Sequence, residues 1–464
     1  MLNLPCASYK KNFNINMNLR HLLGILSLWS LVIGKTMAQD ALSLEQALRV
    51  GLEKNFSIQI EEQRVEIARN SNTLGQAGMW PSVNIGATTS ISRTEIDNPA
   101  SFLSSGNIKG NAINPTVGVA WTLFNGFNVR ITKDRLEYLE RQSLGNAQIV
   151  VENAIQAIIL AYYTALLEKE RLYVFGRTLK LSGDRYDYGR LKGQLGTAVT
   201  FNILQDKNAY LTDSSNYILQ IQNYKNALRN LNLLMGIDIE KEYQLSDSLQ
   251  VQPQEFNKDD LFARMTSNNS NLKNQYLNQE IFKRDVLLAK SAMYPSLVIN
   301  ANGSRNQQVQ DLSSAIFANG QTGDSGIKST TLNYTAGITL SYTLFNGNRI
   351  RTQLENARVS EQISLIQVSE LKASLKNNLI TNYDQYNMRK QLLSIAKENV
   401  ETSNLNLQLA TDRYRNGTIT SFEFRDIQIT NLLTSINYLQ AIYNVIETET
   451  ELMRLTGGLS ANSQ

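Results

Sequence analysis

The side chains most often used for catalysis and metal binding are almost absent from this 464-residue chain. Its only cysteine is Cys6 and its only histidine is His21. Both precede residue 39, where we expect the mature chain to begin, so the mature chain has neither a thiol nor an imidazole. This excludes disulfides, thiolate or imidazole metal sites, and acid–base catalysis by histidine. Carboxylate chemistry stays open, but no spacing singles out such a group, so we predict no enzyme, metal site or cofactor.

Residues 1–38 have the composition of a secretory signal peptide. Arg20 and His21 form a basic region, residues 22–34 form a short apolar run, and residues 36–38 resemble a cleavage site. Met17 is a plausible true start. The apolar run is too short to cross a bilayer, and we expect no later stretch to reach the ~20 apolar residues that a spanning helix needs.

The net charge of +4 belongs to this N-terminal segment. Residues 1–38 contain four of the 45 basic residues and none of the 41 acidic ones, so the mature chain is neutral. A neutral chain gives no electrostatic reason to expect a nucleic-acid partner.

An internal duplication organises the rest of the chain. The sequence Thr-Leu-Phe-Asn-Gly at Thr122–Gly126 returns at Thr343–Gly347, 221 residues later. Trp80-Pro81 matches Tyr294-Pro295 at an offset of 214. The seven extra residues of the second copy are expected in a glycine-rich loop around residues 309–331, because insertions collect at exposed loop tips.

Each repeat is predicted to contain a helix, a β-hairpin, a very long helix, a short break and a second helix. Repeat 1 covers residues 39–236, with a helix from 39 to about 78, a hairpin at 82–124, a long helix at 127–192 and a break at 193–197. Repeat 2 covers residues 259–458, with a hairpin at 296–345 and a break at 416–419. Residues 237–258 are predicted to be a connector and residues 459–464 a tail.

Local signals support these helix ends. Ser43 begins a capping box, and Gly236 is suited to end the helix before it. Asn125 and Asn346 are expected to cap the long helices.

The predicted strands alternate between apolar and small polar side chains, as half-buried strands do. The stretch 93–115, which contains two prolines, is predicted to be a loop. Each strand has the ~9–11 residues that a tilted transmembrane strand needs. Four strands cannot close a barrel and open edges are not viable in lipid, so three copies with twelve strands are expected.

Aromatic residues gather at the helix-proximal ends of the strands, where an interfacial girdle would place them. They are Trp80, Trp121, Phe124, Tyr294, Tyr342 and Phe345. Ordinary core packing is the alternative interpretation for Trp80 and Trp121.

The long helix has an alanine-rich heptad seam from Ala147 to Tyr186. An ordinary dimeric coiled coil would have the same seam. The long helix is about as long as the two shorter helices of its repeat placed end to end, which would allow a helical tube. A periplasmic coiled-coil structural protein without a channel is the alternative function.

The order of these elements resembles the TolC-type outer-membrane efflux family over essentially the whole mature chain. The resemblance rests on the repeat, the Trp/Tyr-Pro-Ser strand starts, the Leu-Phe-Asn-Gly junctions and the Arg413-Tyr414-x-x-Gly417-Thr418 turn. It implies a fold that is mainly α with a β-barrel, an internally duplicated channel-tunnel. Four transmembrane strands per chain would form a 12-stranded outer-membrane barrel in a homotrimer, surrounded by outer-membrane lipid and continuous with a long periplasmic α-helical barrel.

The resemblance also implies a function. The protein would be the passive exit duct of a tripartite efflux or type I secretion system, docking a periplasmic adaptor (membrane-fusion) protein and an inner-membrane transporter. Drugs, metal ions and polypeptides leave through the same kind of duct, so the resemblance does not select a substrate.

In that family, the tips of the two helix pairs close the periplasmic entrance. The matching positions here are Gly196, Thr197, Asn202, Tyr414, Gly417, Thr418, Ile419, Glu423 and Asp426. Glu423 and Asp426 lie three apart on one helical face and fit inward acidic rings, although solvated surface charges have the same spacing. Ile419 and Asn202 replace an arginine and an aspartate of some members. Apolar or hydrogen-bonded closure therefore fits this chain as well as a charged latch.

Overall fold

The computed structural model describes residues 41–98, 100, 102–197 and 199–461. The predicted signal peptide, including Met17, lies outside the described residues, as do residues 462–464 of the predicted tail.

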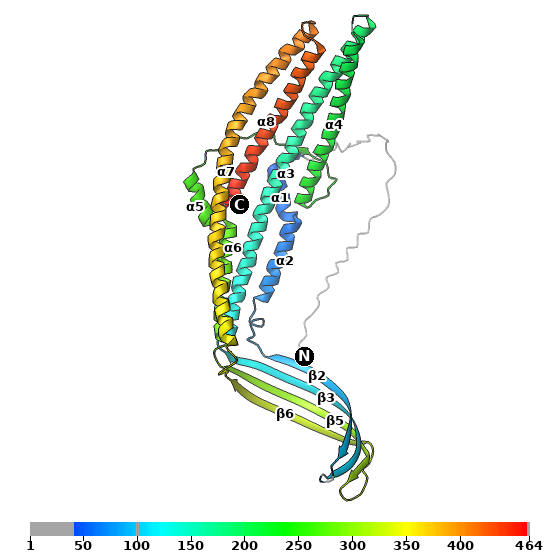
Figure 1. Ribbon diagram of the computed structural model, residues 1–464, viewed down its shortest axis with the longest axis vertical. Helices are drawn as coiled ribbons and strands as arrows, with labels where there is room; N and C mark the ends of the chain where they lie inside the picture. Colours follow the sequence, from blue (N-terminus) through cyan, green and yellow to red (C-terminus); the bar gives the residue numbers. More distant parts are fainter. Residues whose placement is uncertain (1–40, 99, 101, 198, 462–464) are drawn as a thin grey trace, which may run out of the picture. The chain divides into compact units, whose positions relative to one another are not determined.

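Apart from a short final helix in the second copy, the described chain contains the same series of elements twice (Figure 1). The first copy consists of β1 (Ala41–Leu42), α1 (Leu44–Lys54), α2 (Phe56–Ser71), β2 (Ser82–Asp97), β3 (Leu103–Asn125), α3 (Asn128–Gln194) and α4 (Thr200–Met235). The second consists of β4 (Gln244–Leu245), α5 (Lys258–Asn268), α6 (Ser270–Ser291), β5 (Ser296–Phe317), β6 (Ile327–Ser341), α7 (Arg349–Arg415), α8 (Ser421–Leu455) and α9 (Gly458–Ala461). The long helices α3 and α7 each have 67 residues, which corresponds to a length of ~100 Å.

The single helix predicted from 39 to about 78 is wrong. The chain forms α1 and α2 there, with a break at Asn55, and the second copy breaks at Asn269 between α5 and α6. Each asparagine accepts a hydrogen bond from the helix that follows it. Each also donates through Nδ2 to the end of a helix distant in sequence, Asn55 to the Leu234 carbonyl (2.7 Å) and Asn269 to that of Leu455 (3.0 Å). This tertiary contact fixes the break, and periodicity alone does not reveal it.

The two hairpins join into one antiparallel sheet with the strand order β2-β3-β5-β6. The register places Val83 opposite Val119, Val119 opposite Ala301, and Ala301 opposite Ala336. Residues opposite each other point to the same side of a sheet. The apolar rows of all four strands therefore share one face, and β2 and β6 form the two edges.

The predicted loop at 93–115 is also wrong, because β2 continues to Asp97 and β3 already begins at Leu103. Backbone pairing extends to Asp97 opposite Ser105 and does not depend on apolar alternation. Pro115 pairs with Ala87, while the ladder between β3 and β5 has no pair at residues 114 and 115, where the proline lacks an N–H. The second loop is likewise shorter than 309–331, because β5 extends to Phe317 and β6 begins at Ile327.

The two Thr-Leu-Phe-Asn-Gly copies differ in structure. The first lies in β3, which pairs with β5 as far as Asn125 opposite Ser296. The second lies beyond β6, which ends at Ser341. Ser296 is the first residue of β5 and lies opposite Ser341, so no described strand lies opposite residues 342–344, which were predicted to be strand.

The N-caps of the long helices lie two residues later than the predicted Asn125 and Asn346. They are Phe127 and Asn348, both in the left-handed region with φ of 66° and 64°. The preceding glycines also have positive φ, and two successive left-handed residues turn the chain before the helix can start. Asn125 still accepts a hydrogen bond from the Val129 N–H (3.4 Å).

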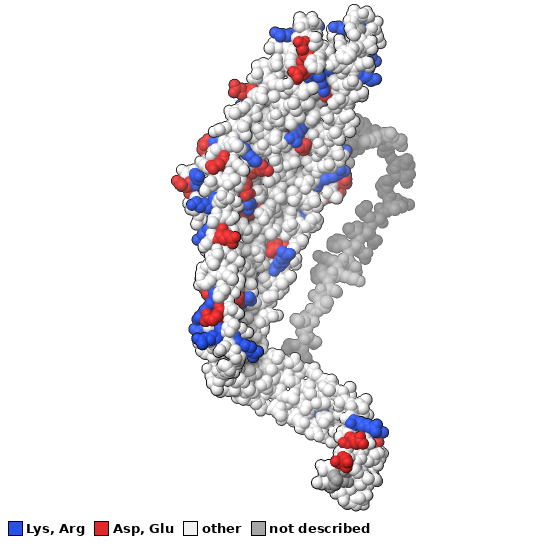
Figure 2. Space-filling view, viewed as in Figure 1, with Lys and Arg blue, Asp and Glu red and all other residues white. Residues whose placement is uncertain are grey.

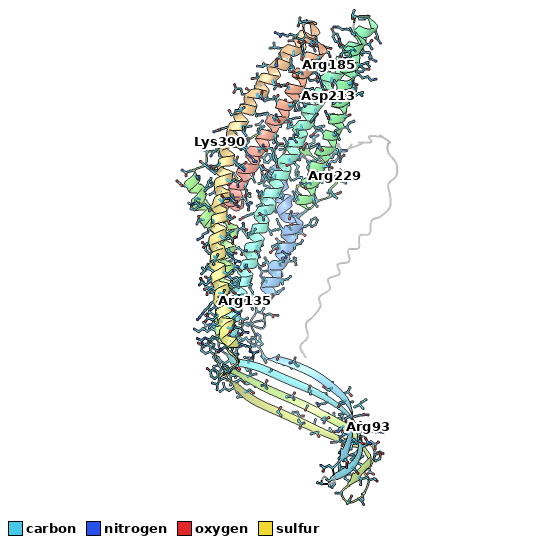
Figure 3. All side chains as sticks on the ribbon, viewed as in Figure 1. Arg93, Arg135, Arg185, Asp213, Arg229 and Lys390 are labelled. Carbon is cyan, nitrogen blue, oxygen red and sulfur yellow. The ribbon has the colours of Figure 1, made fainter. Side chains whose placement is uncertain are left out.

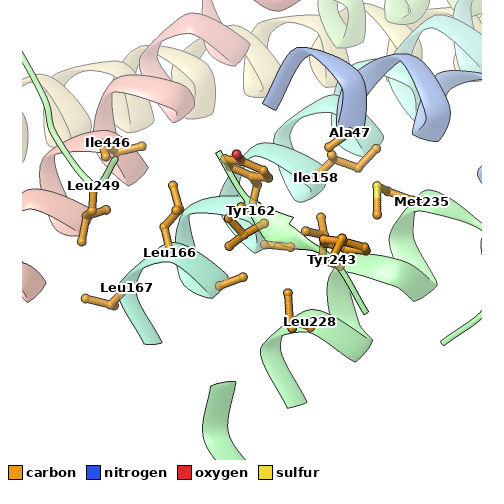
Figure 4. Packing of buried hydrophobic residues seen from close by; sticks show 14 of the residues in the cluster. Ala47, Ile158, Tyr162, Leu166, Leu167, Leu228, Met235, Tyr243, Leu249 and Ile446 are labelled. Carbon is orange, nitrogen blue, oxygen red and sulfur yellow. The ribbon is translucent and has the colours of Figure 1, made fainter. Parts of the chain in front are cut away.

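The main apolar core surrounds the middle of α3 (Figure 4). Ile158, Tyr162 and Leu166 are fully buried against α1, α4 and the connector, which contributes Tyr243 and Leu245. Contrary to the sequence-based expectation, α3 contains an 18-residue window apolar enough to cross a membrane by length and composition. The apolar side chains of α3 include the core residues Ile158, Tyr162 and Leu166.

Candidate functional site

The turns that join the long helices to α4 and α8 have the same geometry. Gly196 and Gly417 have φ of 75° and 74°, and neither has an atom within 4 Å of where a Cβ would lie. The left-handed backbone, and not lack of space, therefore favours glycine there. Thr197 donates from its N–H and Oγ1 to the Lys192 carbonyl (2.9 and 3.1 Å), and Thr418 binds the Arg413 carbonyl likewise (2.9 and 3.0 Å).

Tyr414 packs inside its own chain. Its ring stacks on Phe424 of α8 at 5.0 Å between centroids and meets Tyr188 of α3 edge-on at 6.4 Å. Burial raises the pKa of Tyr414, and the nearby negative charge of Asp206 raises it further. The phenol therefore stays neutral and lies between the two helical hairpins.

Glu423 caps the helix on which it lies. Its carboxylate accepts hydrogen bonds from the N–H (2.7 Å) and hydroxyl (2.9 Å) of Thr420, and Thr420 accepts one from the Glu423 N–H (3.2 Å). These bonds hold the pKa of Glu423 below its ordinary value. Asp426 lies on the next turn, and both carboxylates are exposed.

Sequence reasoning missed a group of buried charges behind these turns. Asp206 of α4 is 1% exposed; it lies 3.0 Å from Arg185 Nε of α3 and accepts a hydrogen bond from the Ser421 hydroxyl of α8. Burial raises the pKa of Asp206 even though both partners favour its charged form. Burial likewise lowers the pKa of Arg185.

A second buried pair joins the same helices. Arg425 of α8 binds Asp213 of α4 through two parallel contacts of 2.6 and 2.8 Å. Gln428, one turn further on, donates to the Thr178 carbonyl of α3 (3.0 Å). Arg185 and Asp213 lie along the same part of the helices, near the turns (Figure 3). Asp206 and Asp213 are seven residues apart, a heptad spacing that could have revealed a shared face.

The predicted aromatic residues gather at the end of the sheet that adjoins α3 and α7. A cavity of 450 Å³ is lined by Trp80, Trp121 and Phe124, and one of 320 Å³ by Tyr342 and Phe345. Tyr294 contacts Phe127 edge-on at 6.5 Å between ring centroids.

The profile of the outer membrane efflux protein family matches residues 48–237 and 261–458. The chain belongs to this family. The two matched segments correspond to the two copies of the duplication.

Individual efflux and export proteins are similar over most of their length. Toxin and drug export protein A of Aggregatibacter actinomycetemcomitans is 19% identical over 336 residues, which cover 72% of this chain and 70% of that protein. The Campylobacter jejuni CmeC outer membrane channel has a TM-score of 0.70 at 14% identity, covering 90% of this chain and 88% of CmeC. The open state of the Neisseria gonorrhoeae MtrE outer membrane channel has a TM-score of 0.66 at 16% identity, covering 91% and 90%. The fold is therefore that of the TolC-like outer membrane channels, as the sequence resemblance implied.

The matched family and the similar solved structures are outer-membrane channel proteins. Among the described residues, no group of three or more Asp, Glu, His or Cys side chains could hold a metal ion. The buried charged side chains near the turns join helices to one another.

Proposed function

We propose that this protein is a passive exit duct in the outer membrane, formed by three copies of the chain, and that its helices extend into the periplasm. The observation that carries the proposal is the sheet β2-β3-β5-β6, which is apolar on one face and has no other described strand paired to either edge. In lipid, every backbone polar group needs a partner, so such a sheet must close with further strands. Three copies give twelve strands in a closed ring.

The charge pattern of the sheet supports a membrane crossing. No charged residue occurs in 82–92, 110–129, 296–304 or 329–348, which form the helix-proximal parts of the four strands and their junctions. In Figure 2 this part of the sheet is largely free of blue and red side chains. The shortest of these stretches still has the ~9 residues that a tilted strand needs to cross the hydrocarbon core.

The outer faces of the helices support assembly into a tunnel. Leu204, Leu211 and Ile218 of α4 are each half exposed or more and follow a seven-residue spacing. On α7, Leu392 and Ile395 are exposed in the same way. Neighbouring copies would cover these apolar stripes in the manner of a coiled coil.

In this arrangement the turns form the periplasmic entrance. Gly196, Thr197, Gly417 and Thr418 would face a periplasmic adaptor that connects the duct to an inner-membrane transporter. Tyr414 would hold the two hairpins of one chain together.

A disulfide between the two edges of the sheet tests the closed ring. Within one chain, β3 and β5 separate β2 from β6, so Ile85 and Ile338 are ~14 Å apart or more, beyond disulfide reach. If β6 of one copy lies beside β2 of the next, Ile85→Cys combined with a cysteine at 336, 338 or 340 will form a covalent trimer in outer-membrane fractions.

The mature chain has no native cysteine to interfere, and Ile85→Cys alone is the control that should give no cross-link. A monomer for every pair, a ladder longer than three, or recovery from the soluble periplasm would refute the closed trimeric barrel.

The acidic ring at Glu423 and Asp426 needs a substitution that keeps the helix cap. Glutamine is accepted at this position of a capping box, so Glu423→Gln with Asp426→Asn removes both charges and preserves the cap. In planar bilayers, we expect lower cation selectivity and weaker block by multivalent cations. Unchanged selectivity and block would mean that these carboxylates do not face the pore.

A further inference from the structure

The two cavities at the strand-to-helix junctions are related by the internal duplication. The first lies between the end of β3 and the start of α3, and the second between the end of β6 and the start of α7. Trp121, Phe124 and Arg130 of the first correspond to Tyr342, Phe345 and Arg351 of the second, each 221 residues later. The same apolar and basic lining therefore occurs twice.

Each cavity combines apolar side chains with basic ones, Arg130 and Lys133 in the first and Arg351 in the second. Trp80, Trp121 and Phe124 line the first, and Trp121 is held in place by a hydrogen bond from Nε1 to the Met79 carbonyl (3.0 Å). Arg130 and Lys133 also line this cavity. Such a cavity suits a ligand with an apolar body and an anionic group.

Among the described residues, the basic side chains at the start of α3 and α7 have no acidic partner. Of the residues that the structure describes, no carboxylate lies within 4.0 Å of a nitrogen of Arg130, Arg349 or Arg351. By contrast, Arg135 is paired with an aspartate on a neighbouring helix. Lys133 donates to an amide oxygen, Asn72 Oδ1, at 2.6 Å.

These arginines lie at helix N-termini, where the lack of an acidic partner matters more. Arg130 lies in the first turn of α3, and Arg349 and Arg351 lie in the first turn of α7; neither turn contains an acidic residue. The N-terminus of a helix carries partial positive charge and favours anions, so cations there are unfavourable unless an anion joins them. Both repeats thus place positive charge where the helix also requires a negative partner.

The first cavity is lined by a residue of the apolar face of the sheet, and the second lies just beyond the end of β6. Trp121 lies opposite Ile299, and Ile299 lies opposite Ile338, all on the apolar face. Basic side chains gather at the helix ends beside the charge-free part of the sheet (Figure 2). Together these features place each cavity where acyl chains would meet headgroups.

We propose that the two cavities bind anionic phospholipid of the periplasmic leaflet. An acyl chain would occupy the aromatic part, and the phosphate would contact Arg130 in the first cavity and Arg351 in the second. Arginine pairs well with phosphate because its guanidinium donates two parallel hydrogen bonds. The inference rests on the proposed function, in which the sheet crosses the outer membrane.

Tryptophan fluorescence offers a direct test, because the mature chain has two tryptophans and both line the first cavity. The full mature protein is placed in phosphatidylcholine nanodiscs with increasing amounts of phosphatidylglycerol brominated in its acyl chains. We expect strong quenching at a low fraction of this lipid, and Arg130→Gln should raise the fraction needed by about tenfold or more.

Two matched controls are Arg351→Gln, in the other cavity, and Arg358→Gln, which removes an arginine paired with Glu355 further along α7. Both should leave the quenching unchanged. The tryptophan reporter can be moved to the second cavity by Tyr342→Trp combined with Trp80→Phe and Trp121→Phe. In that protein Arg351→Gln should weaken the quenching and Arg130→Gln should leave it unchanged.

Equal quenching in the wild type and Arg130→Gln would overturn the proposal. So would equal quenching by brominated phosphatidylcholine, which would indicate only general lipid contact. If inorganic phosphate restored the fluorescence, the site would recognise the ion alone, and the lipid assignment would also be overturned. The cross-link between cysteines at 85 and 338 distinguishes failure of the lipid sites from failure of the trimeric duct. A covalent trimer with nonspecific quenching would refute the lipid sites and still support the duct.

Discussion

The buried pair Arg425–Asp213 provides the sharpest test of how the two helical hairpins are held together. The Asp213 side chain is 2% exposed and that of Arg425 is 16% exposed. Arg425→Leu leaves the carboxylate buried without its two charged hydrogen bonds. Removal of one partner from a buried ion pair costs ~3–5 kcal/mol.

The reciprocal and double substitutions distinguish a charge effect from a packing effect. Asp213→Leu should cost less, ~1–3 kcal/mol, because Arg425 is less buried and keeps its contact with Gln428 (3.1 Å). The double leucine variant should lie within ~1 kcal/mol of the wild type or be more stable, because an apolar pair often replaces a buried ion pair without loss. The double-mutant cycle should therefore give a coupling of ~3 kcal/mol or more.

Amide hydrogen exchange of α4 and α8 near the turns measures this locally. For Arg425→Leu we expect exchange faster by a factor on the order of 10² to 10³, with the double variant close to the wild type. Arg190–Asp187 is a matched control: an Arg–Asp pair near the same turns whose side chains are 63% and 69% exposed. Its disruption should cost less than ~1 kcal/mol.

Exchange in Arg425→Leu no faster than in the Arg190→Leu control would refute this reasoning. An additive double variant would also refute it, because the two side chains would then act independently.

Two further predictions concern helix ends. Asn269→Ala removes a cap and leaves the Leu455 carbonyl unpaired in a buried position, so thermal unfolding should show that the free energy of unfolding falls by ~2–4 kcal/mol. The control Asn257→Ala removes only an exposed cap and should lower it by ~0.5–2 kcal/mol. Equal losses in the two variants would exclude a role for the Leu455 contact. Hydrogen bonds from Thr420 lower the pKa of Glu423 in the folded protein. The ionised Glu423 carboxylate therefore stabilises the first turn of α8 above the unfolded-state pKa, and this stabilisation is lost as pH falls through the lower folded-state pKa. Amide exchange corrected for intrinsic rates should detect this loss in the wild type and not in Glu423→Gln; the same pH profile in both would contradict it.

Whether a sequence prediction succeeded depended on how far apart in the chain the interacting residues lie. Gly236 was predicted as a helix end and is one, with φ of 67°, because the left-handed cap is a local requirement for glycine. Ser43 forms the predicted capping box for the same reason. The strand ends were missed because pairing with a neighbour sets them, as Ser341 opposite Ser296 demonstrates.

The candidate site divides in the same way. The turn residues Gly196 and Gly417 were found from a repeated local motif. Asp206 and Arg425 were not, because a charged residue on a heptad helix looks like a solvent-facing one until the partner helix is known. The cavity residues were predicted as separate aromatics, and only the fold brought Trp121 and Arg130 together.

The sequence by itself determined the duplication, the apolar rows of the strands and the two glycine turns, because these can be recognised without knowing which distant segments pack together. The tertiary structure alone decided where helices break, which charges are buried and which side chains share a cavity. Those features arise from contacts such as Asn269 with Leu455, 186 residues apart, and Arg425 with Asp213, 212 residues apart. Their energies depend on burial, which a chain acquires only when distant segments pack together.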